Sequence, residues 1–389
     1  MRFSTLLLSC ATVLLAGCAT ISDTVDALNP FSKSAPKSKP APLPSFQPQA
    51  EVIRLWQASI GKAGEYVLTP AVVGESVYAA ARDGTLARLD DGRQVWRIET
   101  GKVFSGGVGA SDRLVVVGTP KGEVLAFHAQ DGKLAWQAQV SSEILASPAL
   151  AGDLVVVRSN DARIFAFDAV DGKRRWVYQR PTPALVLRST AGVVLIDKAI
   201  YAGFPGGKLV AISRSNGAAL WEASVALPRG TTELERIADV ASDPVVETDT
   251  VCAVAYQGRL ACFDSDNGRQ LWARDISSVA GLDIGHRAIV VSDEKGVLQA
   301  FDRTGGATLW KQDKLRLRGV GRPLALGRKV VVGDFEGYLH VLAEDDGSIL
   351  ARQATDGSAI AAAPRRLKGL DDRLVVQTKN GSVLAFSLR

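Results

Sequence analysis

The side chains that most often carry out chemistry are few in this chain and widely separated. His128, His286 and His340 lie in different parts of the sequence, and none has a histidine or cysteine neighbour at the spacing of a zinc site. The sequence has neither a phosphate-binding loop nor a Gly-x-Ser-x-Gly nucleophile elbow. Most aspartates stand beside glycine in turn sequences, where the carboxylate usually bonds its own backbone. We therefore predict a non-enzymatic protein, with no catalytic, cofactor-binding or metal-binding residues.

Among the four cysteines, Cys18 has the clearest chemical context. It closes the sequence Leu15-Ala16-Gly17-Cys18, which follows a positive start and an apolar stretch too short for a comfortable membrane span. This ending resembles the lipobox of bacterial lipoproteins, which implies cleavage before Cys18 and diacylation of its sulfur. Residues 1–17 are therefore predicted to be a signal peptide. Ala19 stands where a signal for inner-membrane retention would favour Asp, so the outer membrane is expected.

Cys252 and Cys262 flank the turn sequence Tyr256-Gln257-Gly258 within a single repeat. In an oxidising compartment this arrangement permits a cross-strand disulfide. The two residues would equally serve as small buried hydrophobic side chains. Strand register decides between these alternatives, and the sequence alone does not fix register to one residue.

Residues 18–50 have the composition of a tether. Six prolines and three lysines lie between residues 30 and 48, and both residue types favour an extended, unfolded chain. Fully extended at ~3.1 Å per residue, this segment would reach roughly 100 Å. The chain carries a net charge of +5, with basic clusters that include Arg174-Arg175 and Arg365-Arg366. Because a secreted chain rarely meets nucleic acid, we expect these clusters to be a solvated surface rather than a binding site for anionic lipid.

A repeated phrase, Asp/Asn-Gly-x-x-x-Trp, organises the rest of the chain. It begins at Asp91-Gly92, Asp131-Gly132, Asp171-Gly172, Asn216-Gly217 and Asn267-Gly268, in drifted form at Gly305-Gly306, and at Asp346-Gly347 with Ala351 in place of tryptophan. Asp-Gly and Asn-Gly pairs are strong hairpin signals, and each unit reads as four short apolar strands. A fixed period of about 40 residues indicates one supersecondary unit stacked many times.

Eight strand-turn-strand cores can be counted between Val77 and Leu388. The eighth ends before its last strand, whereas Trp56 stands alone in a strand-like segment at the other end of residues 51–389. We therefore predict an all-β fold, an eight-bladed β-propeller of four-stranded antiparallel blades whose last blade is closed by the N-terminal strand. Such closure removes exposed sheet edges. The recurring tryptophan is expected to pack between neighbouring blades rather than to stack on a cofactor.

Two links between successive blades are unusually long. The interval from Trp176 to Trp221 is 45 residues, and that from Trp221 to Trp272 is 51 residues. Insertions on one face of a repeat protein often mark its binding face. Leu185, Leu187 and Arg188 lie in the first link, and exposed aliphatic residues beside arginine suit a protein interface. Alternatively, Leu185 and Leu187 begin the next inner strand and are buried.

The repeat, with examples in Gly122-Glu-Val-Leu-Ala-Phe127 and Gly258-Arg-Leu-Ala-Cys-Phe-Asp264, resembles that of eight-bladed propellers of the pyrroloquinoline-quinone type. Together with the lipobox, the tether and the long links, the chain resembles the BamB family of lipoproteins in outer-membrane β-barrel assembly. The resemblance implies a scaffold that binds the periplasmic POTRA domains of BamA and assists nascent outer-membrane proteins. It implies partner contacts at Leu185, Leu187 and Arg188, and single contacts at Arg236 and Asp239, since Ala241 replaces the family's second Asp.

Two other functions remain open at this point. A quinone-dependent dehydrogenase would share the repeat, but those enzymes carry a vicinal cysteine pair that this sequence lacks. An envelope scaffold with another partner, such as a peptidoglycan or polysaccharide factor, is also compatible, because fold does not fix function.

Overall fold

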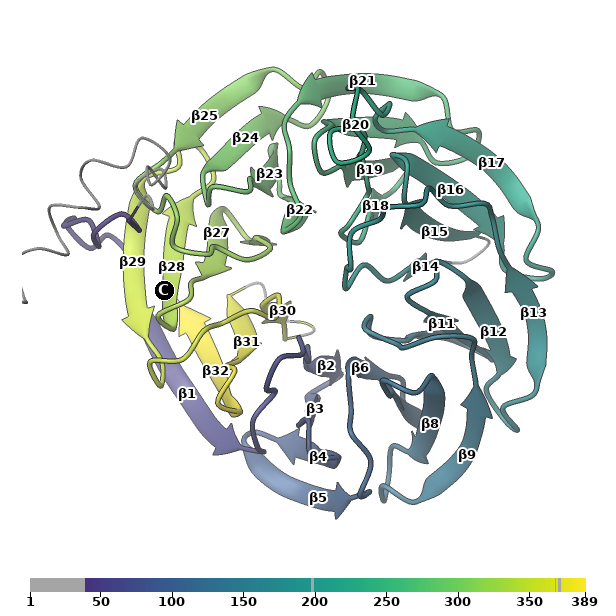
Figure 1. The fold of residues 1–389 in the computed structure, drawn as a ribbon. Helices are drawn as coiled ribbons and strands as arrows, with labels where there is room; N and C mark the ends of the chain where they lie inside the picture. Colours follow the sequence, from purple (N-terminus) through teal and green to yellow (C-terminus); the bar gives the residue numbers. More distant parts are fainter. Residues whose placement is uncertain (1–38, 197–198, 368, 370–371) are drawn as a thin grey trace, which may run out of the picture. The chain divides into compact units, whose positions relative to one another are not determined.

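The computed structural model describes residues 39–196, 199–367, 369 and 372–389, so Cys18 and the predicted signal peptide lie outside the described residues. Residues Ala41–Arg389 form one compact unit. Its strands β1 to β32 form eight four-stranded sheets, which surround a central axis (Figure 1). The predicted eight-bladed β-propeller is therefore confirmed. Nowhere in the described ranges is there a helix of the length and apolar character that crossing a membrane requires.

Each blade runs from an innermost strand near the axis to an outermost strand at the rim. Blade one has β2 (Ala71–Val73), β3 (Ser76–Ala80), β4 (Thr85–Asp90) and β5 (Arg93–Glu99); blade two has β6 (Gly106–Ala110), β7 (Leu114–Gly118), β8 (Glu123–His128) and β9 (Leu134–Gln139); blade three has β10 (Ala149–Ala151), β11 (Leu154–Arg158), β12 (Ile164–Asp168) and β13 (Arg174–Tyr178); blade four has β14 (Val194–Leu195), β15 (Ala199–Phe204), β16 (Lys208–Ser213) and β17 (Ala219–Ser224). Blade five has β18 (Val245–Glu247), β19 (Thr250–Val254), β20 (Arg259–Asp264) and β21 (Gln270–Asp275); blade six has β22 (Gly281–Ile284), β23 (Ala288–Ser292), β24 (Leu298–Asp302) and β25 (Thr308–Gln312); blade seven has β26 (Leu324–Leu326), β27 (Lys329–Gly333), β28 (Tyr338–Ala343) and β29 (Ile349–Ala354); blade eight has β30 (Arg365–Arg366), β31 (Arg373–Gln377), β32 (Ser382–Leu388) and β1 (Val52–Ser59).

The N-terminal strand closes the ring. β1 pairs antiparallel with β32, from Val52 opposite Leu388 to Ser59 opposite Ser382. The last blade is thus built from both ends of the propeller, as the orphan position of Trp56 predicts. Neither β32 nor the first blade is left as an open edge of the ring.

The tryptophans hold successive blades together. In six repeats the indole Nε1 donates a hydrogen bond of 2.6–3.2 Å to a backbone carbonyl of the next blade, as from Trp136 to Ala169. The turn glycine of the next repeat lies against the indole face: a β-carbon at Gly172, where φ is +71°, would lie 2.6 Å from the ring of Trp136. One residue type thus sets both the tight turn and the spacing between blades. The predicted packing role is confirmed.

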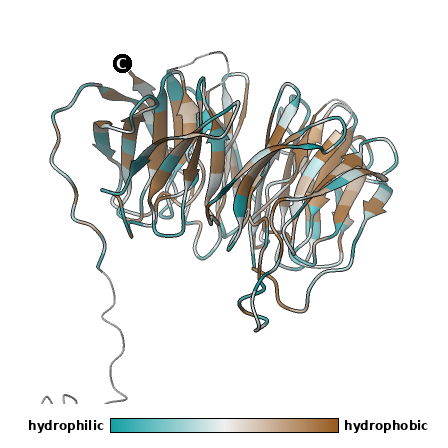
Figure 2. Cartoon of the chain, turned by 90° about the horizontal axis from the view of Figure 1, so that it is seen from above, coloured by the Kyte–Doolittle hydropathy of each residue, from teal (hydrophilic) through white to brown (hydrophobic). Residues whose placement is uncertain are grey.

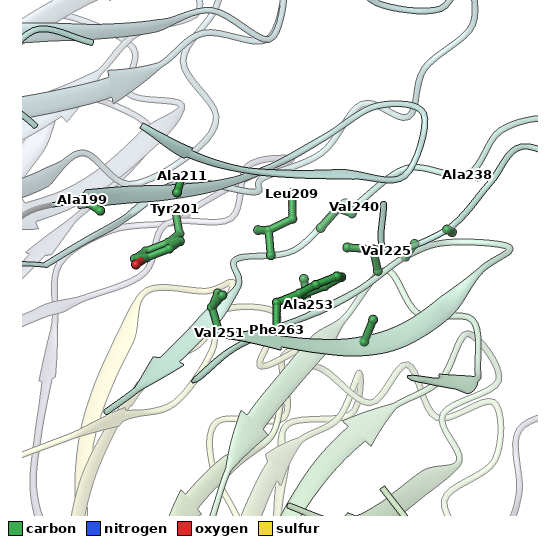
Figure 3. Packing of buried hydrophobic residues seen from close by; sticks show 13 residues of the cluster. Ala199, Tyr201, Leu209, Ala211, Val225, Ala238, Val240, Val251, Ala253 and Phe263 are labelled. Atoms are coloured by element: carbon green, nitrogen blue, oxygen red, sulfur yellow. The ribbon is translucent and has the colours of Figure 1, made fainter. Parts of the chain in front are cut away.

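The hydrophobic core lies between the faces of neighbouring blades. Between blades four and five, Tyr201 and Leu209 pack against Val251 and Phe263, and Val240 from the long link fills the same layer (Figure 3). Figure 2 shows the hydrophobic residues concentrated in the strands and many hydrophilic residues in the connecting loops. The core is therefore distributed around the ring, and the second long link packs on blades four and five through Val240.

The end of the predicted tether is folded against the propeller, so its prediction as unfolded chain up to residue 50 is wrong. The carbonyl of Pro44 accepts a hydrogen bond of 2.8 Å from Arg352 in β29, and Phe46 lies under the same guanidinium at 5.1 Å. The backbone of Ala41 bonds Arg316 and Arg318. Extended, proline-rich chain has free carbonyls, and the side chains of Arg352 and Arg318 donate to them, whereas the N–H of Ala41 donates to the backbone carbonyl of Arg316. We call residues 41–50 the strap.

Cys252 and Cys262 lie directly opposite each other on β19 and β20. Their sulfur atoms are 1.97 Å apart, bonded as a disulfide within blade five. Both residues are fully buried. The register that the sequence left open therefore brings the two side chains to the same face of the sheet.

Candidate partner-binding face

Two long links lie side by side at blade four. The first, residues 179–193, runs from β13 to β14, and the second, residues 225–244, runs from β17 to β18 (Figure 1). β14 begins only at Val194, so Leu185 and Leu187 are not part of the inner strand. The alternative that these two leucines are simply the start of a buried strand is wrong.

Asp239 joins the two links. One carboxylate oxygen accepts a hydrogen bond of 2.7 Å from the backbone N–H of Leu187, and the other accepts one of 3.0 Å from Gly206. The residue is only 3% exposed. Asp239 is therefore an internal brace that positions Leu187, whereas the resemblance implies a direct contact with a partner.

The charge of Asp239 lies near a buried arginine. Arg158 donates a hydrogen bond of 2.6 Å to the carbonyl of Gly203 and stacks over Phe204 at 5.2 Å. Burial lowers the pKa of Arg158 to about 10, while the charges of Asp243 and Asp239 act in the opposite direction. Arg158 thus ties β11 of blade three to β15 of blade four beneath the two links.

The tip of the first link is exposed. Leu185 is 44% exposed and Val186 is 40% exposed, whereas Leu187 is half-buried over the brace. In the second link Leu227 and Leu234 are also exposed. Aliphatic side chains that are held on rigid backbone but left in water are typical anchors for a protein partner.

Arg188 is exposed but not free. Its guanidinium forms two hydrogen bonds of 3.0 and 2.9 Å with the carboxylate of Glu143, in the link between β9 and β10. This bond raises the pKa of Arg188. The side chain is consequently held beside Leu187 with part of its edge open to solvent, a suitable position for a carboxylate or carbonyl of a partner.

Arg236 is exposed near the tip of the second link. The turn before it is fixed by Glu235, whose carboxylate accepts hydrogen bonds from the backbone of Thr231 and Thr232 at 2.8 and 3.1 Å. Bonds from these backbone N–H groups lower the pKa of Glu235. The structure thus gathers Leu185, Leu187, Arg188 and Arg236 on the two links and places Asp239 beneath them.

Sequence reasoning missed three members of this region. Glu143 lies in a short link with no motif, and Leu227 and Leu234 belong to no repeated phrase. Only the length of the second link pointed to its two leucines. Among the described residues, no group of three or more His, Cys, Asp and Glu side chains could hold a metal ion. The two links carry exposed leucines and arginines on hydrogen-bonded backbone, which suits the binding of a protein partner.

Comparison with known proteins points to one family. Residues 82–312 and 294–389 match the family described as outer membrane protein assembly factor BamB. The outer membrane protein assembly factor BamB of Burkholderia pseudomallei is 42% identical over 353 residues, which cover 90% of this chain and 92% of that protein. The crystal structure of BamB from Moraxella catarrhalis superimposes with a TM-score of 0.80 at 27% identity, covering 87% of this chain and all of that one.

A quinohemoprotein alcohol dehydrogenase from Comamonas testosteroni also superimposes, with a TM-score of 0.70 over 86% of this chain and 76% of that chain. At 14% identity this likeness shows the propeller fold alone. The family match and the relative from Burkholderia pseudomallei, by contrast, each extend over most of the sequence. This chain belongs to the family of the outer membrane protein assembly factor BamB.

Proposed function

We propose that this chain is a non-enzymatic scaffold for the assembly of outer-membrane β-barrel proteins. It is anchored to the periplasmic face of the outer membrane through a lipid on Cys18, and it docks onto the POTRA domains of BamA through the two long links. The observation that carries the proposal is the exposed pair Leu185 and Val186, held above the buried brace at Asp239. The assembly role rests on the family, and the docking face rests on the links.

A rigid docking face favours binding for a physical reason. Loops that become ordered only on binding lose conformational entropy, about 0.5–1.5 kcal/mol for each immobilised side chain. Here the hydrogen bonds of Asp239 and Glu235 already fix both links in the free protein. Leu185 then buries apolar area against the partner, and Arg188 contributes oriented donors.

The direct test is binding of the purified full chain, in neutral detergent, to the periplasmic domains of BamA. Leu185→Ala and Arg188→Ala are compared with Leu309→Ala, which removes a similarly exposed leucine from β25 of blade six. We expect both link variants to bind at least tenfold more weakly, which is about 1.4 kcal/mol, and the control to bind like wild type. Equal binding by all three variants would move the interface away from the links. No binding by the wild type would favour an envelope scaffold with another partner.

A further inference from the structure

A cavity of about 700 Å³ lies on the axis of the propeller. Residues from or beside the innermost strands of all eight blades line it. The innermost strands that Figure 1 labels surround the axis of the ring. Most of the residues that line the cavity are small and apolar. Its five charged side chains all come from blades five to eight and the segments before them: Asp243, Asp283, Arg322, Arg365 and Arg366. The charged part of the cavity is therefore concentrated on one side.

Most of these charged groups have partners within the wall. Arg322 donates to the carboxylate of Asp243 at 3.1 Å and to the carbonyl of Leu282 at 3.0 Å. Asp283 accepts a hydrogen bond of 2.8 Å from the N–H of Ala325. Arg366 donates a hydrogen bond of 2.7 Å to the carbonyl of Ala325. These bonds tie the inner strands of neighbouring blades together, which is a structural role.

Arg365 is different. Its Nε is buried without a hydrogen-bond partner, and it forms no salt bridge with any of the residues that the structure describes. Burial lowers its pKa, as does the like charge of Arg322, whereas Asp243 and Asp283 raise it. The expectation from the sequence that Arg365 belongs to a solvated surface is therefore wrong, because its side chain lines the cavity.

A second polar atom of the same wall is also unpaired. The hydroxyl of Ser242 is buried and has no hydrogen-bond partner in the described structure. It stands beside Gly281, where φ is +107° and where a β-carbon would lie 3.2 Å from Ser242 Oγ and 3.6 Å from Arg322 Cδ. Any residue with a side chain at this position would fill the space between Ser242 and Arg322. Unpaired buried donors are costly, so these two atoms mark a side of the cavity where the described protein groups leave polar atoms without a partner.

We propose that the side of the central cavity formed by blades five to eight binds a small anion with a carboxylate or phosphate group, recognised by the guanidinium of Arg365. The lining there includes three arginines and two aspartates, and Asp243 is already paired with Arg322. Arginine presents planar donors that match carboxylate and phosphate oxygens in pairs. This site would act independently of the docking face on the two long links.

Isothermal titration of the full chain in neutral detergent and chloride-free buffer tests the proposal, with inorganic phosphate and succinate as separate probes. Arg365→Gln is compared with Arg269→Gln, which removes an exposed arginine from blade five. We expect one saturable site per chain for at least one probe, an affinity at least tenfold lower in Arg365→Gln, and no change in Arg269→Gln. The preferred probe identifies the group that the site takes.

Equal affinity in Arg365→Gln and wild type, or no saturable binding of either probe, would overturn the proposal. A measurement on the unaltered protein guards against a variant that fails to fold. Crystals of wild type soaked in selenate are expected to show an anomalous peak within hydrogen-bond distance of Arg365. Peaks confined to the outer surface would contradict a site in the central cavity.

Discussion

The carboxylate of Asp239 accepts a hydrogen bond of 2.7 Å from the backbone N–H of Leu187, although 52 residues separate them in the sequence. A second bond to Gly206 ties the same carboxylate to the hairpin of blade four. Leu187 in the first link and Asp239 in the second link are therefore joined directly, so the two links form one structural unit. Leu185 and Arg188 face outward, and Asp239 fixes the backbone between them.

Replacing Asp239 with Asn should weaken partner binding by loosening the first link. The amide keeps the size of the side chain, but its NH₂ group would face a backbone N–H, and one buried donor would lose its acceptor. Such a loss costs about 1–3 kcal/mol. Hydrogen exchange at the amides of Leu187 and Gly206 should accelerate in Asp239→Asn and stay unchanged in Asp266→Asn, an exposed turn control. Unaltered protection in Asp239→Asn would contradict the brace.

Variants of the ion pair between Arg188 and Glu143 distinguish the role of the arginine within the protein from its role towards a partner. Because Arg188 is 55% exposed and Glu143 is 22% exposed, solvent screens the pair, and we expect Arg188→Glu alone to change the stability of the propeller by no more than about 1 kcal/mol. The double variant Arg188→Glu with Glu143→Arg restores an ion pair with reversed charges. Binding to BamA, measured by titration, should stay weak in both. Full recovery in the double variant would show that Arg188 acts only by holding Glu143.

The sequence predicts the ring because its signals are local and repeated. Each Asp-Gly turn and each tryptophan indicates where the strands of its own blade lie in the sequence. The lone Trp56 indicates how the ring closes. The docking face is harder to predict, since it depends on contacts such as that of Arg188 with Glu143, 45 residues apart in irregular links. The lengths of the two links indicated where to expect the proposed docking face. The path of the backbone decided that Asp239 points inward and Arg188 outward.

The strap shows a second limit of predicting structure from amino-acid composition. Its prolines correctly indicate extended chain, but they do not reveal whether that chain has a binding site. The carbonyl of Pro44 meets Arg352 across 308 residues, and that of Ala41 meets Arg318 across 277. No local pattern links these positions. Residues 41–50 are therefore not available to the predicted tether, which shortens the reach expected from the sequence.

Substitution of the turn glycines should separate backbone strain from crowding against tryptophan. Gly74 and Gly172 have similar φ values, +60° and +71°, but a β-carbon at Gly74 would meet nothing within 4 Å. Gly74→Ala should cost about 1–2 kcal/mol from the left-handed conformation alone. Gly172→Ala should cost about 1–3 kcal/mol more, because its methyl group would press on Trp136. Guanidinium denaturation of both variants gives the difference, and equal costs would mean that the contact with the indole is unimportant.

The bridge between Cys252 and Cys262 should stabilise blade five. In the chain-entropy account a bridge that closes a loop of this length contributes about 2–3 kcal/mol. We expect mass spectrometry of the unreduced protein to find the two cysteine-containing peptides joined, and the double variant Cys252→Ala with Cys262→Ala to unfold at lower guanidinium concentration. Alkylation of both thiols in denatured, unreduced protein would show that the cysteines are only buried side chains.

The buried His340 should make stability depend on pH. Burial lowers its pKa, the bond of 3.0 Å to Asp334 opposes this shift, and the charges of Arg352 and Arg318 lower the pKa further. Between the lowered pKa of the folded state and the ordinary value of 6.5, the unfolded chain binds more protons. The free energy of unfolding should therefore fall as the pH drops below 6.5. His340→Gln should flatten this slope, measured by denaturation at several pH values, with His128→Gln reporting any general effect of losing a histidine. A slope in His340→Gln as steep as in wild type would assign the pH dependence to other groups.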